Sequence, residues 1–172
     1  MTRPAHDYGV DDALAAKGFE QAKAAVLIDR WAPLLKFWIP GEPQAQPRAK
    51  AARVGGFVRV YTPATADNWK RNIEIYSKPF QPDSPYDCPL RVDVIYFFSR
   101  PEYLLRPDSP RDPIPHPQKP DRDNCDKALL DTLTGLKFWK DDKQVFDGRI
   151  RKYYVPLFGQ PGALVTISRV PE

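Results

Sequence analysis

The sequence predicts an α/β fold of the two-layer α+β type, in which two core helices cover a single mixed sheet. Residues 90–98 alternate apolar side chains like a strand, and residues 124–134 repeat them at helical spacing. Twenty prolines against nine glycines indicate many extended, pinned connections. At 172 residues the chain fits one principal domain, with a core large enough to need no disulfide.

Residues 1–34 are predicted to form an N-terminal helical extension, and residues 35–172 the domain itself. The stretch 11–31 is rich in alanine, which favours helix, and it ends before Pro33. The sequence has no run of about 18 apolar residues and no signal-peptide core, so we expect a cytoplasmic protein without a membrane partner. Cys88 and Cys125 lack the spacing of a zinc site or a disulfide framework, which agrees with a reducing compartment.

The first half of the domain is predicted to contain two strands and one helix. A short strand at 37–39 ends at Pro40-Gly41, a basic loop covers 41–56, and residues 57–61 return as a strand. Thr65 is the expected N-cap of a helix whose apolar residues recur at helical spacing, namely Ala66, Trp69, Ile73 and Tyr76.

The second half begins with a central strand at 90–98, because both of its faces carry apolar residues. Seven prolines between 101 and 120 then predict a long extended excursion, which in a compact domain is usually functional or mobile. The helix at 124–134 buries an apolar face that includes Cys125, and Gly135 is its expected C′ residue. Residues 144–154 are predicted to form a strand with a bulge at Gly148, and a final strand surrounds 163–167.

The charges are unevenly distributed along the chain, although the net charge is only +4. Between Arg48 and Arg71 there are six basic residues and one acid, whereas acids gather at 121–147. Such a basic run is either a solvated loop or a surface that grips phosphates, giving strongly salt-dependent binding. The residues that we assign to DNA contact are Arg48, Lys50, Arg53 and Lys119.

Asp121 and Asp123 are the strongest candidates for chemistry. Pro120 disfavours helix at 119–121, and in an extended segment side chains two apart share a face, with alpha carbons about 7 Å apart. Carboxylate oxygens suit Mg²⁺, which can activate a water for attack on a phosphodiester. The return after the helix can bring a third carboxylate, from Asp141 or Asp142, beside them, and Lys127 on the first helical turn can hold the scissile phosphate.

Each of these residues except Asp121 also has a purely structural interpretation. Asp123 with Asp126 resembles a capping box, Asp141 and Asp142 suit a turn, and Lys127 suits a solvated surface. Taken singly, the structural interpretation is the better one for each residue. Their conjunction in one window of a basic chain favours Mg²⁺-dependent cleavage of nucleic acid. Phe138 and Trp139, beside the second acidic pair, are expected to pack in the core.

The window 119–145 resembles the signature of RusA-type Holliday-junction resolvases, the crossover junction endodeoxyribonucleases of bacteria and their phages. The resemblance rests on Lys-Pro-Asp-Arg-Asp-Asn at 119–124, Lys127, Leu-Thr-Gly at 133–135 and Trp-Lys-Asp-Asp-Lys-Gln-Val at 139–145, and it extends over 36–170. It implies a homodimer that nicks four-way DNA junctions during recombination and repair, using Mg²⁺, for which Mn²⁺ can substitute. It also implies that Asp121, Asp123 and Asp142 hold the metal and that Lys127 supports catalysis.

Two other functions remain open on the sequence. The chain could be a non-catalytic DNA-binding protein of the same fold, or a metal-dependent nuclease that acts on other branched DNA. Cleavage in Mg²⁺ separates the first from a resolvase, and a comparison of DNA substrates separates the second.

Overall fold

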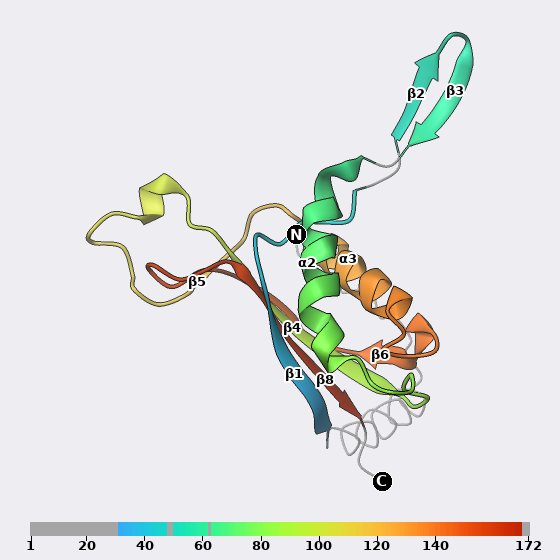
Figure 1. Cartoon of the computed structure of the whole chain (residues 1–172). Helices are drawn as coiled ribbons and strands as arrows, with labels where there is room; N and C mark the ends of the chain where they lie inside the picture. The colour runs from blue at the N-terminus through green and yellow to red at the C-terminus, as the bar shows by residue number, and fades with distance from the viewer. Residues whose placement is uncertain (1–30, 48–49, 62, 170–172) are drawn as a thin grey trace, which may run out of the picture.

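The computed structural model describes residues 31–47, 50–61 and 63–169, so the helix expected within 11–31 lies almost entirely outside it. The described residues form a six-stranded sheet, a separate two-stranded hairpin and two α-helices (Figure 1). The strands are β1 (Ala32–Pro40), β2 (Lys50–Val54), β3 (Phe57–Tyr61), β4 (Leu90–Phe98), β5 (Ile114–Pro115), β6 (Val145–Asp147), β7 (Ile150–Tyr154) and β8 (Gly162–Arg169). The α-helices are α2 (Asp67–Ser77) and α3 (Arg122–Gly135), and the short 3₁₀ turns are η1 (Ala64–Ala66), η2 (Lys78–Phe80), η3 (Glu102–Leu104) and η4 (Asp142–Gln144).

The predicted mixed sheet is confirmed, with strand order β1-β8-β4-β7-β5 and with β6 also paired to β4. β4 runs antiparallel to β8 and parallel to β6 and β7. Parallel neighbours require a crossover connection, and α3 supplies it between β4 and the β6–β7 segment. β4 is therefore the central strand, as its two apolar faces predicted.

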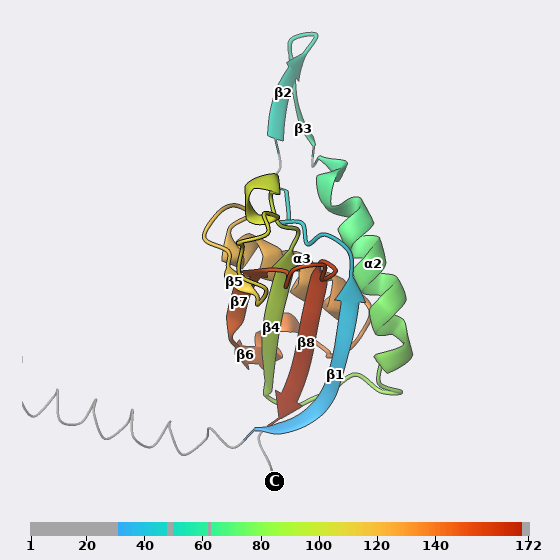
Figure 2. The ribbon, with the colours of Figure 1, turned by 90° about the vertical axis from the view of Figure 1, so that its left-hand side faces the viewer.

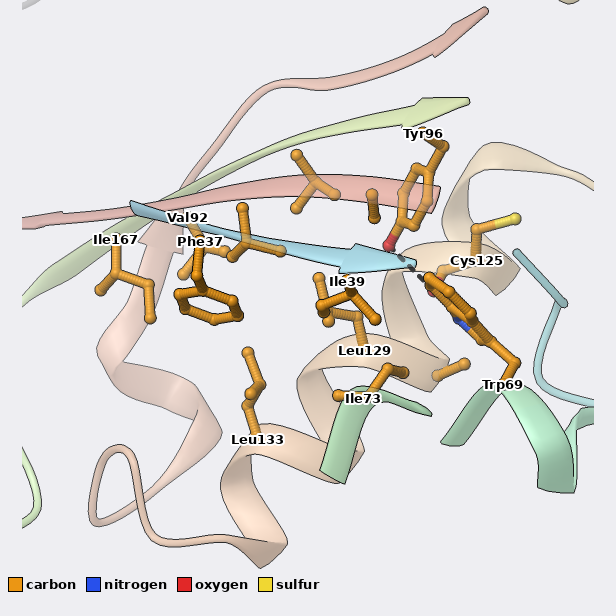
Figure 3. Close-up of a cluster of buried hydrophobic side chains, with 14 of the residues drawn as sticks. Phe37, Ile39, Trp69, Ile73, Val92, Tyr96, Cys125, Leu129, Leu133 and Ile167 are labelled. Atoms are coloured by element: carbon orange, nitrogen blue, oxygen red, sulfur yellow. Dashed lines mark hydrogen bonds between the residues drawn. The ribbon is translucent and has the colours of Figure 1, made fainter. Parts of the chain in front are cut away.

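One face of this sheet carries the core. The alternating residues of β4 point toward α2 and α3, together with side chains from β1 and β8 (Figure 3). All five residues expected on this face of β4 are buried, and so are Phe138 and Trp139. The apolar face of α3 is likewise buried at Cys125, Ala128, Leu129 and Leu133. The two-layer arrangement is thus built from the periodicities of the sequence.

No α-helix of the described chain covers the opposite face of the sheet (Figure 2). Trp38 on β1 is 38% exposed, and its ring centroid lies 5.8 Å from that of Phe97 on β4. Phe97 in turn stacks on Tyr153 of β7 at 6.1 Å. A row of half-exposed aromatic side chains therefore crosses this open face.

The first half of the domain differs from the prediction in three places. β1 begins at Ala32, so it includes residues assigned to the extension. Part of the expected loop 41–56 is strand β2, which pairs with β3 through a turn at Gly55-Gly56. Both glycines have positive φ, 57° and 87°, as a tight two-residue hairpin requires. Thr65 does not cap α2, because η1 precedes the helix and Ala66 takes the N-cap position without a side-chain bond.

The end of α3 also differs from the prediction. Gly135 is still helical, and Lys137 adopts the left-handed conformation at φ 63°. The amide of Phe138 donates to Leu133 O at 3.2 Å and that of Lys137 to Thr134 O at 3.0 Å, which is a Schellman motif. Burial of Phe138 beside Leu133 fixes the stop two residues later than the glycine suggested.

The expected strand at 144–154 is broken in two rather than bulged. Gly148 lies between β6 and β7, and a Cβ there would come within 2.1 Å of the Val92 carbonyl oxygen. Only glycine permits this close approach to the backbone of β4.

The proline-rich excursion after β4 is held by one buried side chain. The Arg100 guanidinium donates to Val155 O at 2.7 Å, to Pro110 O at 2.6 Å and to Asp112 O at 2.7 Å. Its far end returns to the sheet as β5, which pairs with β7. None of the helices in the described ranges is long and apolar enough to cross a membrane.

Candidate active site

Residues 116–120, which lead into α3, are fixed to β7 by Lys152. The Lys152 ammonium donates to Gln118 O at 2.6 Å and to Pro120 O at 2.5 Å. The backbone carbonyl of Lys152 accepts from His116 N at 3.0 Å. The buried His116 ring stacks on Phe98, with centroids 4.3 Å apart. The chain therefore enters α3 in a defined position.

The first turn of α3 is anchored from two further sides. Tyr96 on β4 donates its hydroxyl to Cys125 O at 3.1 Å (Figure 3), and Gln46 N donates to Asn124 O at 2.9 Å. Burial raises the pKa of the Cys125 thiol to about 12, so this cysteine packs as a neutral apolar group, as predicted. These bonds use backbone carbonyls and leave the side chains of Asp121 and Asp123 exposed.

The sequence predicted Asp121 and Asp123 on one extended segment, and the structure differs. Asp121 has extended backbone and occupies the N-cap position, whereas Asp123 is already in the first helical turn. The Asp121 carboxylate makes no capping hydrogen bond, and Asp123 is not the cap. Both side chains are exposed at the amino terminus of α3, where the helix dipole favours anions or metal-bound phosphate.

An open hollow of about 370 Å³ runs along the exposed side of α3. It brings together Asp123, Lys127 and Asp142, three of the four residues assigned to catalysis, and Asp121 is not among its lining residues. The other residues that line it are Arg122, Asp126, Leu130, Asp131 and Ile150. Asp123 and Lys127 are four residues apart and so share a helix face, while Asp142 reaches the hollow from η4.

The loop after α3 separates the roles of the two adjacent aspartates. Asp141 caps η4, because its carboxylate accepts from Lys143 N at 3.1 Å and the Gln144 side chain accepts from Asp141 N at 2.9 Å. The hydrogen bonds from the Lys143 backbone and side chain lower the pKa of Asp141. Asp141 is thus used structurally, and Asp142 is the exposed member of the pair that borders the hollow.

The sequence reasoning did not assign Asp126 and Asp131 to the site. They lie three and eight residues after Asp123, which is helical spacing, and this period could have identified an acidic helix face. Burial raises the pKa of Asp126 to about 6, against an opposing effect of Arg122. The hollow therefore contains a carboxyl group that gains its proton more readily than an ordinary aspartate.

The donor set fits a hard divalent cation. Among the residues that the structure describes, no group of three or more histidine, cysteine or acidic side chains is arranged to hold a metal by itself. Mg²⁺ commonly binds through one or two carboxylates, with waters and substrate phosphates completing its shell. Exposed carboxylates at Asp123 and Asp142, with Asp121 nearby in sequence, meet that requirement.

The residues assigned to DNA contact are spread over the molecule. Arg48 lies outside the described residues, and Lys50 is placed only by the backbone of β2. Arg53 is exposed on the hairpin, which projects from the body of the domain (Figure 2). Lys119 is exposed two residues before Asp121. Of the four, Lys119 alone is close in sequence to the acidic residues of the site.

Comparison with known proteins identifies a family for this chain. The family model described as endodeoxyribonuclease RusA matches residues 40–168, which include the hollow and both segments that border it. The chain is also 29% identical over 134 residues to Uncharacterized protein YqaN of Bacillus subtilis, covering 70% of this chain and 87% of that protein. Because the family match extends over most of the chain and contains the acidic site, this protein belongs to the RusA family of endodeoxyribonucleases.

Proposed function

We propose that this protein is a Mg²⁺-dependent, structure-selective endonuclease that resolves four-way DNA junctions by paired nicks during recombination and repair. The observation that carries the proposal is the hollow along α3, where Asp123, Asp142 and Lys127 meet in a chain of an endodeoxyribonuclease family. Carboxylates and a lysine beside a helix amino terminus form an environment suited to a metal-bound phosphate.

Each group has a distinct part in the proposed reaction. Asp123 and Asp142, assisted by Asp121, would hold Mg²⁺, which when bound acidifies a water and neutralises phosphoryl charge. Lys127 would contact a non-bridging oxygen of the scissile phosphate and stabilise its developing charge. The bonds from Lys152 and Tyr96 fix the segment that carries Asp121 and Asp123, which preserves their positions while substrate binds.

Cleavage assays on three substrates of equal length test the proposal. The wild type should nick a four-way junction in Mg²⁺ faster than a flap or a linear duplex. Asp123→Asn and Asp142→Asn should each lower the cleavage rate by at least about 10²-fold. Both variants should still bind the junction in the absence of metal. Asp108→Asn, at an exposed acid remote in sequence from the site, is the matched control.

Two outcomes would replace the proposal. Junction binding by the wild type without cleavage in Mg²⁺ or Mn²⁺ indicates a DNA-binding protein that retains the fold. Equal or faster cleavage of flaps indicates a nuclease for other branched DNA.

We also propose that the active form is a homodimer, because two equivalent sites match the paired strands of a junction. The support in this chain is the open face of the sheet, where the row Trp38, Phe97 and Tyr153 remains half-exposed. Adjacent apolar side chains of this kind mark contact surfaces in many proteins. Sedimentation equilibrium should give twice the chain mass, and Phe97→Asp should reduce it to one chain. A monomeric wild type would exclude the dimer.

A further inference from the structure

The β2–β3 hairpin has no role in the proposed catalytic site. Its two strands pair only with each other and form a sheet separate from the main one. Figures 1 and 2 show it extending beyond the amino-terminal end of α2, away from the body of the domain. An isolated two-stranded hairpin is marginally stable in water, so an element of this shape is best explained by a partner that it contacts.

The tip of the hairpin is narrow and apolar. Gly55 and Gly56 make the two-residue turn, and beyond each glycine and its chain neighbours no described atom lies within 4 Å of where a Cβ would stand. Phe57 follows at once and is 81% exposed, and Val58 is 65% exposed. Successive residues of a strand face opposite sides, so each face of the tip presents an apolar side chain to solvent.

The positive charge of the hairpin indicates which kind of partner it binds. Residues 50–61 contain Lys50, Arg53 and Arg59 and no acidic residue. Arg53 pairs across the hairpin with Val58, and Arg59 pairs with Ala52. Both side chains are exposed: Arg53 lies two residues before the turn, and Arg59 lies two residues after Phe57. Arg59 shares a face of the hairpin with Phe57, and Arg53 lies on the other face beside Val58. An exposed aromatic ring on a tip with an arginine on each face matches the requirements of nucleic acid, where phosphates attract the cations and a base face accepts the ring.

We propose that this tip enters the branch point of the DNA and that Phe57 stacks on a base exposed there, while Arg53 and Arg59 contact the surrounding phosphates. The inference rests on the proposed function, since it concerns the same branched substrate. In a continuous duplex each base is covered by its neighbours, and an aromatic side chain must unstack a step to reach one. At a branch point the stack is already interrupted, so Phe57 would favour branched over linear DNA.

Binding measured without catalysis tests this proposal. The full chain is titrated, in EDTA, with a four-way junction that carries 2-aminopurine at the branch and with a duplex of equal length. Phe57→Ala should weaken junction binding by about 5- to 150-fold, the range for loss of one base–aromatic stack, and leave duplex binding unchanged. Phe57→Trp should restore the preference, because its ring also stacks. Phe158→Ala, at a phenylalanine that is 95% exposed, is the matched control and should bind like the wild type.

The charged and apolar contributions can be separated within the same experiment. Phe57→Ala should keep the wild-type salt dependence of binding, whereas Arg53→Gln with Arg59→Gln should reduce its slope by about 2. The 2-aminopurine signal should change on binding of the wild type and not of Phe57→Ala.

An unchanged ratio of junction to duplex affinity in Phe57→Ala would overturn the proposal. So would a Phe57→Ala variant that loses self-association in sedimentation while its junction preference persists, because the hairpin would then contact a second copy of the chain. A wild-type protein that cuts no DNA substrate in Mg²⁺ but binds the junction in a Phe57-dependent way would refute the nuclease function and leave this inference standing.

Discussion

Removal of the Lys152 ammonium should loosen the segment that carries Asp121 and Asp123. Its two bonds to Gln118 O and Pro120 O come from one charged donor. Such bonds are worth about 1.5–3 kcal/mol each when buried, and because Lys152 is half-exposed we expect about 1–3 kcal/mol for the pair. Lys152→Met keeps an apolar side chain of similar length and removes the ammonium, with its two bonds and its position 5.9 Å from the centre of the Phe98 ring.

Hydrogen exchange measures this loosening directly. The amides of His116 and Cys125 are bonded to Lys152 O and Asp121 O, so they report on both ends of the segment. A loss of 1–3 kcal/mol should speed their exchange by about 5- to 150-fold. Junction cleavage should fall by about 10- to 100-fold, since a displacement of about 1 Å can cost 10²-fold in rate. Wild-type exchange at both amides, with wild-type cleavage, would refute the reasoning.

Two control variants complete this experiment. Lys152→Arg retains the charge and enough donors for both carbonyls, so it should recover most of the activity. Arg151→Met changes an exposed residue on the opposite side of the same strand and should leave exchange unchanged. An apparent Mg²⁺ requirement that rises in Lys152→Met and returns with Lys152→Arg would link the segment to metal binding rather than to stability alone.

Two further changes have predictable effects on stability. The raised pKa of Asp126 means that the native state holds its proton more tightly than the unfolded chain, so stability is lost as pH rises between about 4 and about 6. Asp126→Asn should therefore raise the free energy of unfolding at pH 7.5 by at most about 3 kcal/mol, seen as a higher Tm, with little gain below pH 4. An equal gain at both pH values would contradict this origin. Gly148→Ala should destabilise the domain by about 1–3 kcal/mol or more in urea unfolding, because the new methyl would overlap the Val92 carbonyl, and wild-type stability would contradict the close approach.

The sequence predicted the parts of the fold that depend on a strong hydrophobic period. β4 alternates over nine residues, and α3 repeats its apolar face from Cys125 to Leu133, so burial of one face decides each assignment. Hairpin β2–β3 lacks such a period because the side chains described in it are all exposed. Only the Gly55-Gly56 turn signalled it, and that turn was interpreted as part of a loop.

The ends of the elements depended on tertiary contacts that no local pattern contains. Gly135 suggested the stop of α3, but the packing of Phe138 on the core placed the left-handed residue at Lys137. The sequence predicted an extended segment that includes Asp123. Pro120 disfavours helix only for the residue before it, however, so α3 begins as soon as that restriction ends. The geometry of the acidic pair therefore had to come from the structure.

The structure changes how the acidic residues should be understood. A line of acids along one helix face would repel itself in an isolated helix, and a fold selected only for stability would gain by replacing Asp126. The chain instead uses hydrogen bonds from Lys152, Tyr96 and Gln46 to hold the backbone of this segment, and leaves the carboxylates of Asp121 and Asp123 toward solvent. Rigid backbone beneath exposed like charges is the arrangement expected of a site whose carboxylates are neutralised by a bound cation, which in turn attracts the phosphate of the substrate.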